Sequence, residues 1–327
     1  MSTGKWEKKI LSSIESPLEK VIKDQKLNNL IKKIKFSKMI GKTITITPRE
    51  IQYVRKQFAK AVRNGERRLH TLTVSLLEQF LPGKPFGITL IVVGRCPKCK
   101  GITKTKKDFG ADFNEIFKNT EEQLSQKYAP GCFNCNVQTP SIANFLKYWP
   151  LDRQNEKILW ISTRVKANTN LCYKITDIVL DVTYMFKVDK IYNQYSHTLK
   201  DMYGIKIIAE NRATIMNVRD EILKRQDLSC IEEKNYLGKY KKKSGFEAYK
   251  MVMFYDDQYF EIQIQTEDMY ERELLNAKTS HTTYKEKQQF LRKHFGEEYN
   301  SFYKKLCLLF TNENPDQSDN EAIFFGP

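Results

Sequence analysis

The sequence predicts an α/β (α+β) fold: a mixed sheet flanked by helices, preceded by an N-terminal helical region and a small cysteine module. Two observations support this. Strand-like and helix-like segments alternate in the second half of the chain, and four cysteines gather in a short stretch before them. We therefore divide the chain into a basic helical region (1–90), a cysteine module (91–145), an α/β domain (146–310) and a flexible polar tail (311–327).

The composition indicates a folded, basic protein. Hydrophobic residues make up 40% of the 327 residues and aromatic residues 12%, which is enough for a core and excludes a disordered chain. The 55 Lys and Arg exceed the 39 Asp and Glu, for a net charge of +16. This excess favours a polyanionic partner such as nucleic acid, nucleotide phosphates or an acidic membrane surface. A generally lysine-rich proteome would produce the same excess.

The first residues, "MSTGKWEKKI", are polar and lack the apolar run of a signal peptide. The longest apolar run, "FGITLIVVG" (86–94), is too short to span a bilayer and predicts a buried strand. Seven cysteines are an odd number, which argues against a disulfide framework. We expect a cytoplasmic protein with no membrane segment.

The helical region has two parts. Residues 1 to about 40 have apolar residues at helical spacing and predict a basic amphipathic helix. Residues 47–85 predict a stronger helix, in which Thr47 and Glu50 have the spacing of a capping box and Pro82-Gly83 ends the helix.

The cysteine module contains two C-x-x-C pairs, "CPKC" and "CFNC". Two such pairs supply the four thiolates of a closed structural zinc site: Cys96, Cys99, Cys132 and Cys135. Gly101 and Gly131 lie beside the pairs, where tight turns need a permissive backbone, and residues 113–128 predict one helix inside the spacer. Unlinked buried thiols and a redox pair are the alternatives.

The α/β domain begins with a strand at 156–166. The segments that follow are a helix, strand and helix (191–225), a basic glycine loop (237–247), a strand pair turning at "DDQ" (248–266) and a helix (269–295).

The strand "DQYFEIQIQT" (257–266) places polar side chains on one face only. Alternation puts Phe260, Ile262 and Ile264 on one face and Glu261, Gln263 and Gln265 on the other. If this strand neighbours the one that follows Asp201, the carboxylates of Asp201 and Glu261 could converge on a divalent cation such as Mg²⁺.

Cations lie on both sides of this candidate metal site in the sequence. Arg164 and Lys166 share one strand face and Lys174 follows, which suits a triphosphate. Lys242, Lys243 and Lys250 surround Gly245 and Phe246, and a basic loop with one aromatic ring suits a nucleotide.

In this order, the segments resemble the synthetase core of the RelA/SpoT-type alarmone synthetases. The matching pieces span residues 157 to 290: "TRVK", Lys174, "DMYGIK", "KKKSGFEAYK", "EIQIQT" and "SHTTYK". The resemblance implies a nucleotidyltransferase-like fold that transfers pyrophosphate from ATP to a ribose 3′-hydroxyl, usually of GDP or GTP, to make (p)ppGpp.

The resemblance also implies roles for single residues. Asp201 and Glu261 would be catalytic and hold Mg²⁺, and Glu261 would help to activate the attacking hydroxyl. Arg164, Lys166 and Lys174 would bind the ATP phosphates. The acceptor side would comprise Lys242, Phe246, Lys250, Gln263 and His281.

The sequence departs from the family pattern mainly on the acceptor side. Lys206 and Gln265 stand where the family has arginine, Phe246 stands for tyrosine and Lys250 for histidine. The acceptor is therefore open: a guanine nucleotide leads, and the 3′ end of tRNA, as in toxic relatives of the family, is the alternative. A third possibility is a non-catalytic protein that binds RNA or the ribosome.

Overall fold

The computed structural model describes residues 16–152, 157–166, 200–240, 242, 245–273, 308–310 and 323–325. The chain forms two compact units. The sheet unit comprises Met1–Ile14, Gly65–Ala167 and Lys200–Lys278, and the helical unit comprises Glu15–Asn64, Asn168–Leu199 and Thr279–Pro327. No helix among the described residues is both long and apolar enough to cross a membrane.

The helical unit confirms the predicted start of the long helix. α4 (Pro48–Phe80) begins at a capping box, because the Thr47 N–H donates to Glu50 Oε2 at 2.9 Å and the Glu50 N–H donates to Thr47 Oγ1 at 3.3 Å. Only the first part of α4, up to Asn64, belongs to this unit. A short strand pair, β1 (Ile44–Ile46) with β12 (Ile323–Phe325), is also present.

The single amphipathic helix expected up to residue 40 is wrong in one respect. The described part forms two helices, α2 (Pro17–Ile22) and α3 (Gln25–Ile40). The break occurs because Asp24 caps α3, with its Oδ1 accepting from the N–H groups of Lys26 and Leu27 at 3.0 and 3.1 Å. Residues 1–15 lie outside the described residues.

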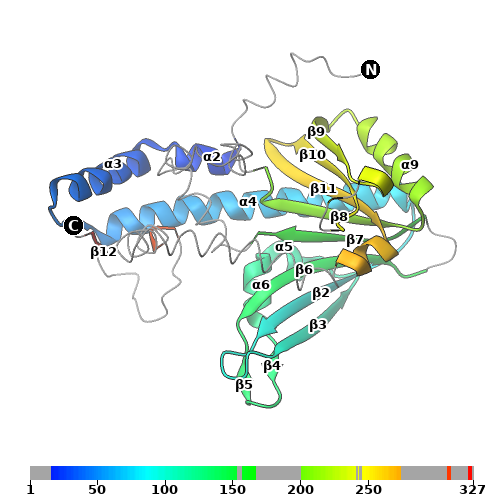
Figure 1. Cartoon of the computed structure of the whole chain (residues 1–327), viewed down its shortest axis with the longest axis horizontal. Coiled ribbons are helices and arrows are strands. Elements are labelled where there is room, and N and C mark those ends of the chain that lie inside the picture. The colour runs from blue at the N-terminus through cyan, green and yellow to red at the C-terminus, as the bar shows by residue number, and fades with distance from the viewer. Residues whose placement is uncertain are drawn as a thin grey trace. The chain divides into compact units, whose positions relative to one another are not determined.

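The sheet unit is built on an eight-stranded mixed sheet, as predicted for the α/β region. Its strand order is β3-β2-β6-β7-β8-β11-β10-β9 (Figure 1). β8 and β11 are parallel and every other pairing is antiparallel. The strands are β2 (Phe86–Arg95), β3 (Ile102–Gly110), β6 (Ser141–Pro150), β7 (Ile158–Val165), β8 (Tyr203–Ala209), β9 (Ser229–Asn235), β10 (Tyr249–Tyr255) and β11 (Gln258–Thr266).

The two faces of this sheet differ in chemistry. On one face Phe260, Ile262 and Ile264 are fully buried, and helix α9 (Arg212–Leu223) contacts β8 and β11. The opposite face, called the polar face below, is the one predicted from the alternation of β11. Strand register places the following described residues on it: Ser162, Arg164, Gly204, Lys206, Lys234, Lys250, Glu261, Gln263 and Gln265.

The predicted turn between β10 and β11 is present. Asp256 and Asp257 both have positive φ, 45° and 60°, which a two-residue hairpin turn of this hand requires. Asp and Asn tolerate this region better than most residues, which explains the "DD" pair. Arg68 on α4 donates to Asp256 at 2.6 Å and holds the turn.

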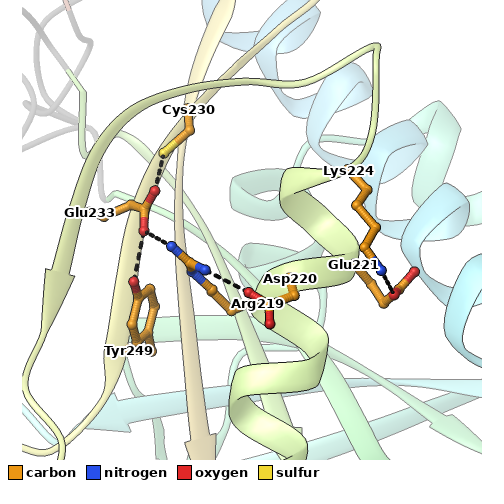
Figure 2. A network of polar contacts seen from close by, with 7 residues as sticks. All are labelled: Arg219, Asp220, Glu221, Lys224, Cys230, Glu233 and Tyr249. Atoms are coloured by element: carbon orange, nitrogen blue, oxygen red, sulfur yellow. Dashed lines mark hydrogen bonds and ion pairs between the residues drawn. The ribbon is translucent and has the colours of Figure 1, made fainter. Parts of the chain in front are cut away.

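A polar cluster fixes α9 against the sheet edge. Figure 2 shows Glu233 of β9 between Arg219 of α9 and Tyr249 of β10. Its Oε2 accepts from Arg219 at 2.8 Å and from the Tyr249 hydroxyl at 2.7 Å. Burial opposes ionisation of Glu233, but these hydrogen bonds outweigh it and lower its pKa. The cluster therefore anchors the two strands that present Lys234 and Lys250 on the other face.

The cysteine module is hydrogen-bonded into the same sheet as the α/β domain. β2 pairs with β3 and β6, and β6 pairs with β7. We call β2, β3, β6 and the segments between them the extension; Figure 1 shows the small β4–β5 pair (Gly131–Cys132 and Val137–Gln138) at its tip. The predicted domain boundary at 91 lies inside β2, and the one at 146 lies inside β6. These boundaries therefore do not separate the strands of the sheet, and a functional division at these positions stays a prediction.

The single helix predicted at 113–128 is wrong. Two short helices, α5 (Asn114–Lys118) and α6 (Glu121–Lys127), occupy the segment. The chain breaks between them because Thr120 adopts extended backbone and forms a capping box with Gln123.

Candidate active site

The polar face brings three predicted site residues onto neighbouring strands. Arg164 on β7 pairs with Gly204 on β8, and Gly204 pairs with Glu261 on β11. Because Gly204 has no side chain, nothing from the middle strand separates Arg164 from Glu261. The sequence-based condition for a metal site, that the strands after Asp201 and around Glu261 be neighbours, is met.

Glu261 lies among nitrogen donors. Gln263 Nε2 donates to its Oε1 at 2.6 Å, and Lys250 forms an ion pair with its Oε2. Lys250 pairs with both Gln263 and Lys234 across the strands, so three cation-bearing or amide side chains share this part of the face. Glu261 itself is only 9% exposed, which strengthens these electrostatic interactions.

Asp201 lies two residues before β8 begins. Lys166 Nζ donates to Asp201 Oδ2 at 2.9 Å, and the Lys166 N–H donates to the Met202 carbonyl at 2.9 Å. The predicted phosphate ligand Lys166 is thereby fixed beside one predicted metal ligand. Each of the two predicted metal ligands, Asp201 and Glu261, therefore contacts a lysine.

Two positions that depart from the family pattern meet on one carboxylate. Lys206 Nζ contacts Glu273 Oε2 at 2.7 Å, and Gln265 Nε2 donates to the same oxygen at 3.0 Å. Burial lowers the pKa of Lys206, and Glu273 acts against this. Sequence reasoning missed Glu273, which lies in a helical stretch directly after β11; a carboxylate facing two altered positions is visible only once strand and helix are packed.

The glycine loop places the Phe246 ring beside Lys242 and Tyr236. Gly245 has φ +81°, which favours glycine, and its N–H donates to the Lys242 carbonyl at 2.8 Å. Lys242 Nζ lies 5.1 Å from the Phe246 ring centre and 4.6 Å from that of Tyr236. Burial, and then the charge of Lys250, lower the pKa of Lys242. Phe246 is half-buried and retains part of its surface for a ligand.

A buried carboxylate anchors this loop. Glu247 is 6% exposed, and its Oε1 accepts from Arg212 at 2.6 Å and from the Gly238 N–H at 2.8 Å. Its Oε2 lies 3.3 Å from a guanidinium nitrogen of Arg272. Sequence reasoning treated Glu247 only as part of the loop motif. Lys174, Lys243 and His281 lie outside the described residues.

A row of cations and rings leaves the site along the polar face. Lys206 Nζ lies 4.9 Å from the Tyr270 ring, Tyr270 meets Trp160 edge-on at 4.9 Å, and Lys147 Nζ lies 4.5 Å from the Trp160 ring. Lys147 is on β6, so the row reaches the extension. No sequence pattern predicted this row, because its four residues come from four separate segments.

Behind the site, Glu121 of α6 is bound to the end of β7. Thr163 Oγ1 donates to Glu121 Oε1 at 3.0 Å, and the Val165 N–H donates to its Oε2 at 3.1 Å. Burial raises the pKa of Glu121 to about 7. These contacts hold the strand from which Arg164 projects on the opposite face. A glutamate after a capping threonine gave no sequence signal of this contact.

The four predicted zinc ligands form one cluster. All four sulfur atoms lie within 4.8 Å of one another, and Cys99 Sγ is 3.6 Å from Cys132 Sγ. A tetrahedral zinc with bonds of about 2.3 Å separates its sulfurs by about 3.8 Å, so the cluster fits this ion. The thiols differ without an ion: burial opposes ionisation of Cys96, but the N–H groups of Cys99 and Lys98 lower its pKa to about 6, whereas the hydrogen bond with Cys99 and burial raise the pKa of Cys135 to about 12.

The two C-x-x-C turns have the same shape. The residue after each pair has positive φ, 63° at Lys100 and 48° at Asn136, and its N–H donates to the carbonyl of the first cysteine, at 3.0 and 2.8 Å. The expectation that Gly101 and Gly131 supply this permissive backbone was wrong, since neither has positive φ. A cysteine cluster at 96–135 thus closes the tip of the extension.

The chain was compared with known proteins. Residues 163–289 match the family model described as "Region found in RelA / SpoT proteins". A search of curated proteins found no match. Solved structures with some similarity include small alarmone synthetase 1 from Bacillus subtilis, at 17% identity and TM-score 0.29, covering 47% of this chain and 73% of that one.

Two others are at a similar level. Small alarmone synthetase 2 from Bacillus subtilis has 19% identity and TM-score 0.29, covering 46% of this chain and 75% of that one. A GTP pyrophosphokinase family protein from Streptococcus pneumoniae has 20% identity and TM-score 0.26, covering 46% and 70%. The family match contains Arg164, Asp201, the glycine loop and Glu261 in their expected order. Residues 163–289 of this chain are therefore similar to the region found in RelA and SpoT proteins.

Proposed function

We propose that the protein is an ATP-dependent pyrophosphokinase that moves the β,γ-pyrophosphate of ATP to the ribose 3′-hydroxyl of GDP or GTP and so makes (p)ppGpp. The observation that supports it best is the nearly buried Glu261 among Lys250, Gln263 and Lys234 on rigid strands, within the RelA/SpoT-type region. Transfer of phosphoryl groups depends on positioning and charge neutralisation more than on covalent chemistry.

In the proposed step, the ribose 3′-oxygen attacks the β-phosphorus of ATP. The bond between that phosphorus and the oxygen bridging to the α-phosphate breaks, and AMP leaves with the bond electrons. The hydroxyl proton passes to Glu261, which Gln263 orients through its 2.6 Å hydrogen bond. Arg164, Lys166 and Lys174 would hold the phosphates of ATP.

Mg²⁺ fits the donor set. Asp201 offers a carboxylate from the turn before β8, and Glu261 offers one from the neighbouring strand β11. Both now contact lysines that phosphate oxygens could engage instead. When bound, the ion would neutralise charge on the phosphates. Lys166 and Lys250 would then contact the phosphates of the nucleotide in place of the carboxylates of Asp201 and Glu261. The cysteine cluster would hold a structural zinc, since four thiolates leave no open position for a substrate.

On the acceptor side, the proposed contacts are Phe246 against the base, with Lys242, Lys250 and His281 near the phosphates or ribose. The Lys206–Glu273–Gln265 contacts mean that two family arginine positions are engaged within the protein. A different acceptor is therefore a real alternative. The net charge of +16 favours the 3′ end of an RNA such as tRNA as the second candidate.

The test is transfer of label from ATP in the presence of Mg²⁺. ATP labelled in the γ-phosphate is incubated with GDP, GTP or deacylated tRNA, and the products are separated. We expect label on GDP or GTP and stoichiometric AMP. Label on tRNA alone would move the assignment to the second candidate, and no AMP with any acceptor would overturn both.

A further inference from the structure

The polar face continues without interruption from the site onto the extension. Lys147 of β6 pairs with Ser162 of β7 and with Thr89 of β2, and on β3 Lys106 pairs with Ile91 and Lys104 with Val93. Four strand spacings separate β8 from β3, or roughly 19 Å at about 4.8 Å each. The extension therefore continues the surface of the site across the sheet, perpendicular to the strands.

The opposite face of the extension is its core. Leu90, Val92, Leu146 and Tyr148 are fully buried there, and α6 contacts β6. On the polar face, by contrast, Lys104 and Lys106 are exposed and Phe145 and Val93 are only half-buried, although Ile91 on this face is buried. The polar face of the extension is thus the open one.

This open face is basic. Its charged residues are Arg95, Lys104, Lys106 and Lys147, with the single carboxylate of Asp108. Among the described residues, none forms an ion pair with Arg95, Lys104 or Lys106. An excess of cations without internal partners is the electrostatic pattern of a surface that binds phosphates.

The face also offers rings. Phe145 on β6 is half-buried, and Phe133 at the tip of the cysteine cluster is 99% exposed. A fully exposed phenylalanine next to a metal-binding turn is costly in water and gains by stacking on a base. Rings interspersed with cations on an open sheet are how proteins bind single strands, whose bases are free to stack.

We propose that the polar face of the extension, with the tip at Phe133, binds single-stranded RNA and leads it toward the site. A single strand fits because duplex bases cannot reach the rings. The choice of RNA over DNA rests on the proposed function, whose acceptor is a ribose hydroxyl; the surface itself rests on Lys104, Lys106 and Phe133.

The test measures binding of a fluorescent single-stranded RNA of about 12 nucleotides to the full chain, by anisotropy between about 50 and 200 mM salt. The double variant Lys104→Glu/Lys106→Glu changes the polar face. Lys107→Glu is the matched control, because Lys107 is on the same strand but on the other face, 5.7 Å from the Tyr128 ring.

We expect the double variant to bind about tenfold more weakly or worse, with a salt slope flatter by about 1.4, since each lost phosphate contact contributes about 0.7. Phe133→Ala, which removes an exposed ring and leaves the fold intact, should weaken binding about fivefold or more. Lys107→Glu should stay within about twofold of the parent. Equal losses for Lys107→Glu and the double variant would overturn the assignment of the face.

Duplex RNA bound as tightly as the single strand would overturn the single-strand inference, and single-stranded DNA bound as tightly would overturn the choice of RNA. The same variants are assayed for pyrophosphate transfer from ATP to GDP, which neither Lys104 nor Lys106 contacts in the proposed site. Pyrophosphate transfer by a parent protein that does not bind RNA would overturn this inference and keep the proposed function. RNA binding by a protein that shows no transfer would overturn the proposed function and keep the RNA-binding surface.

Discussion

Replacing the buried Glu121 by glutamine should change how the stability of the sheet unit depends on pH. The carboxyl accepts from the Thr163 hydroxyl and the Val165 N–H, and it is 1% exposed. Asn144 Nδ2 also lies 3.5 Å from the same oxygen that Val165 contacts. Glutamine keeps the shape and can satisfy all three partners, because its oxygen accepts from Val165 and Asn144 and its amide donates to Thr163 Oγ1, which accepts as well as donates. Glu121→Gln therefore removes the charge and little else.

The magnitude follows from the pKa of Glu121, which burial raises from 4.5 to about 7. Below pH 4.5 the carboxyl is protonated in both the folded and the unfolded chain. Between pH 4.5 and 7 only the unfolded chain loses the proton, so the free energy of unfolding falls as the pH rises. A difference of about 2.5 pKa units corresponds to about 3 kcal/mol. Above pH 7 this loss is complete and constant.

The assay is urea unfolding of the parent and the variant at pH 4.5, 6, 7 and 8. Tryptophan fluorescence suits it, because Trp149 and Trp160 both lie in the sheet unit. The variant should gain stability relative to the parent by about 3 kcal/mol over this range. Groups shared by both proteins, such as the buried His70, cancel in the difference. Glu122→Gln is the control, because it removes the exposed neighbouring carboxylate.

Parallel curves for parent and Glu121→Gln would refute the reasoning, because they would mean that Glu121 titrates alike in the folded and unfolded chain. A stability gain of Glu121→Gln over the parent that grows toward low pH would have the opposite sign to the one expected and would also refute the reasoning. The same pH dependence for Glu122→Gln would attribute the effect to the net charge of the helix.

Three further predictions concern the site and the cysteine cluster. Asp201→Asn and Glu261→Gln should each abolish transfer while circular dichroism and melting stay near those of the parent; near-normal turnover in Mg²⁺ would show that the metal assignment is wrong. The cysteine cluster should hold one zinc per chain, and chelation should loosen the extension; substoichiometric metal in protein purified without added zinc would count against it. Phe246→Ala should weaken use of the acceptor by roughly ten- to hundredfold through lost stacking, with ATP binding close to normal; equal loss of both would mean that the ring is structural.

Local patterns of the chain predicted several of its elements correctly. Alternation identified β11 and the side of it that bears Glu261, and a capping box located the start of α4 at Thr47. The spacing of the cysteines predicted the four-thiol cluster that the structure contains. These predictions succeed because each depends on residues that are close in the sequence. Side-chain direction repeats every two residues in a strand and every three to four in a helix, and the two cysteines of each turn are three residues apart.

Local patterns failed where a competing local interaction broke an element. Asp24 divides the first helix and Thr120 divides the helix of the spacer, because each side chain caps the helix that follows. Lys100 and Asn136, not the glycines, have positive φ in the turns of the cysteine cluster, since the turn needs it at the position after each pair. These signals were present in the sequence but compete with apolar periodicity.

By itself, the sequence predicted the strands at 86–94, 156–166 and 248–266 and the one after Asp201, the polar side of β11, the resemblance to RelA/SpoT-type synthetases and the grouping of the cysteines. It did not predict β3, β6 or β9. The tertiary structure decided which strands are neighbours: β8 beside β11, and the extension in the same sheet. It also decided that Glu273 meets both Lys206 and Gln265. The physical reason is that side-chain direction repeats with a local period, whereas strand order and register are set by burial of apolar faces between segments far apart in the chain.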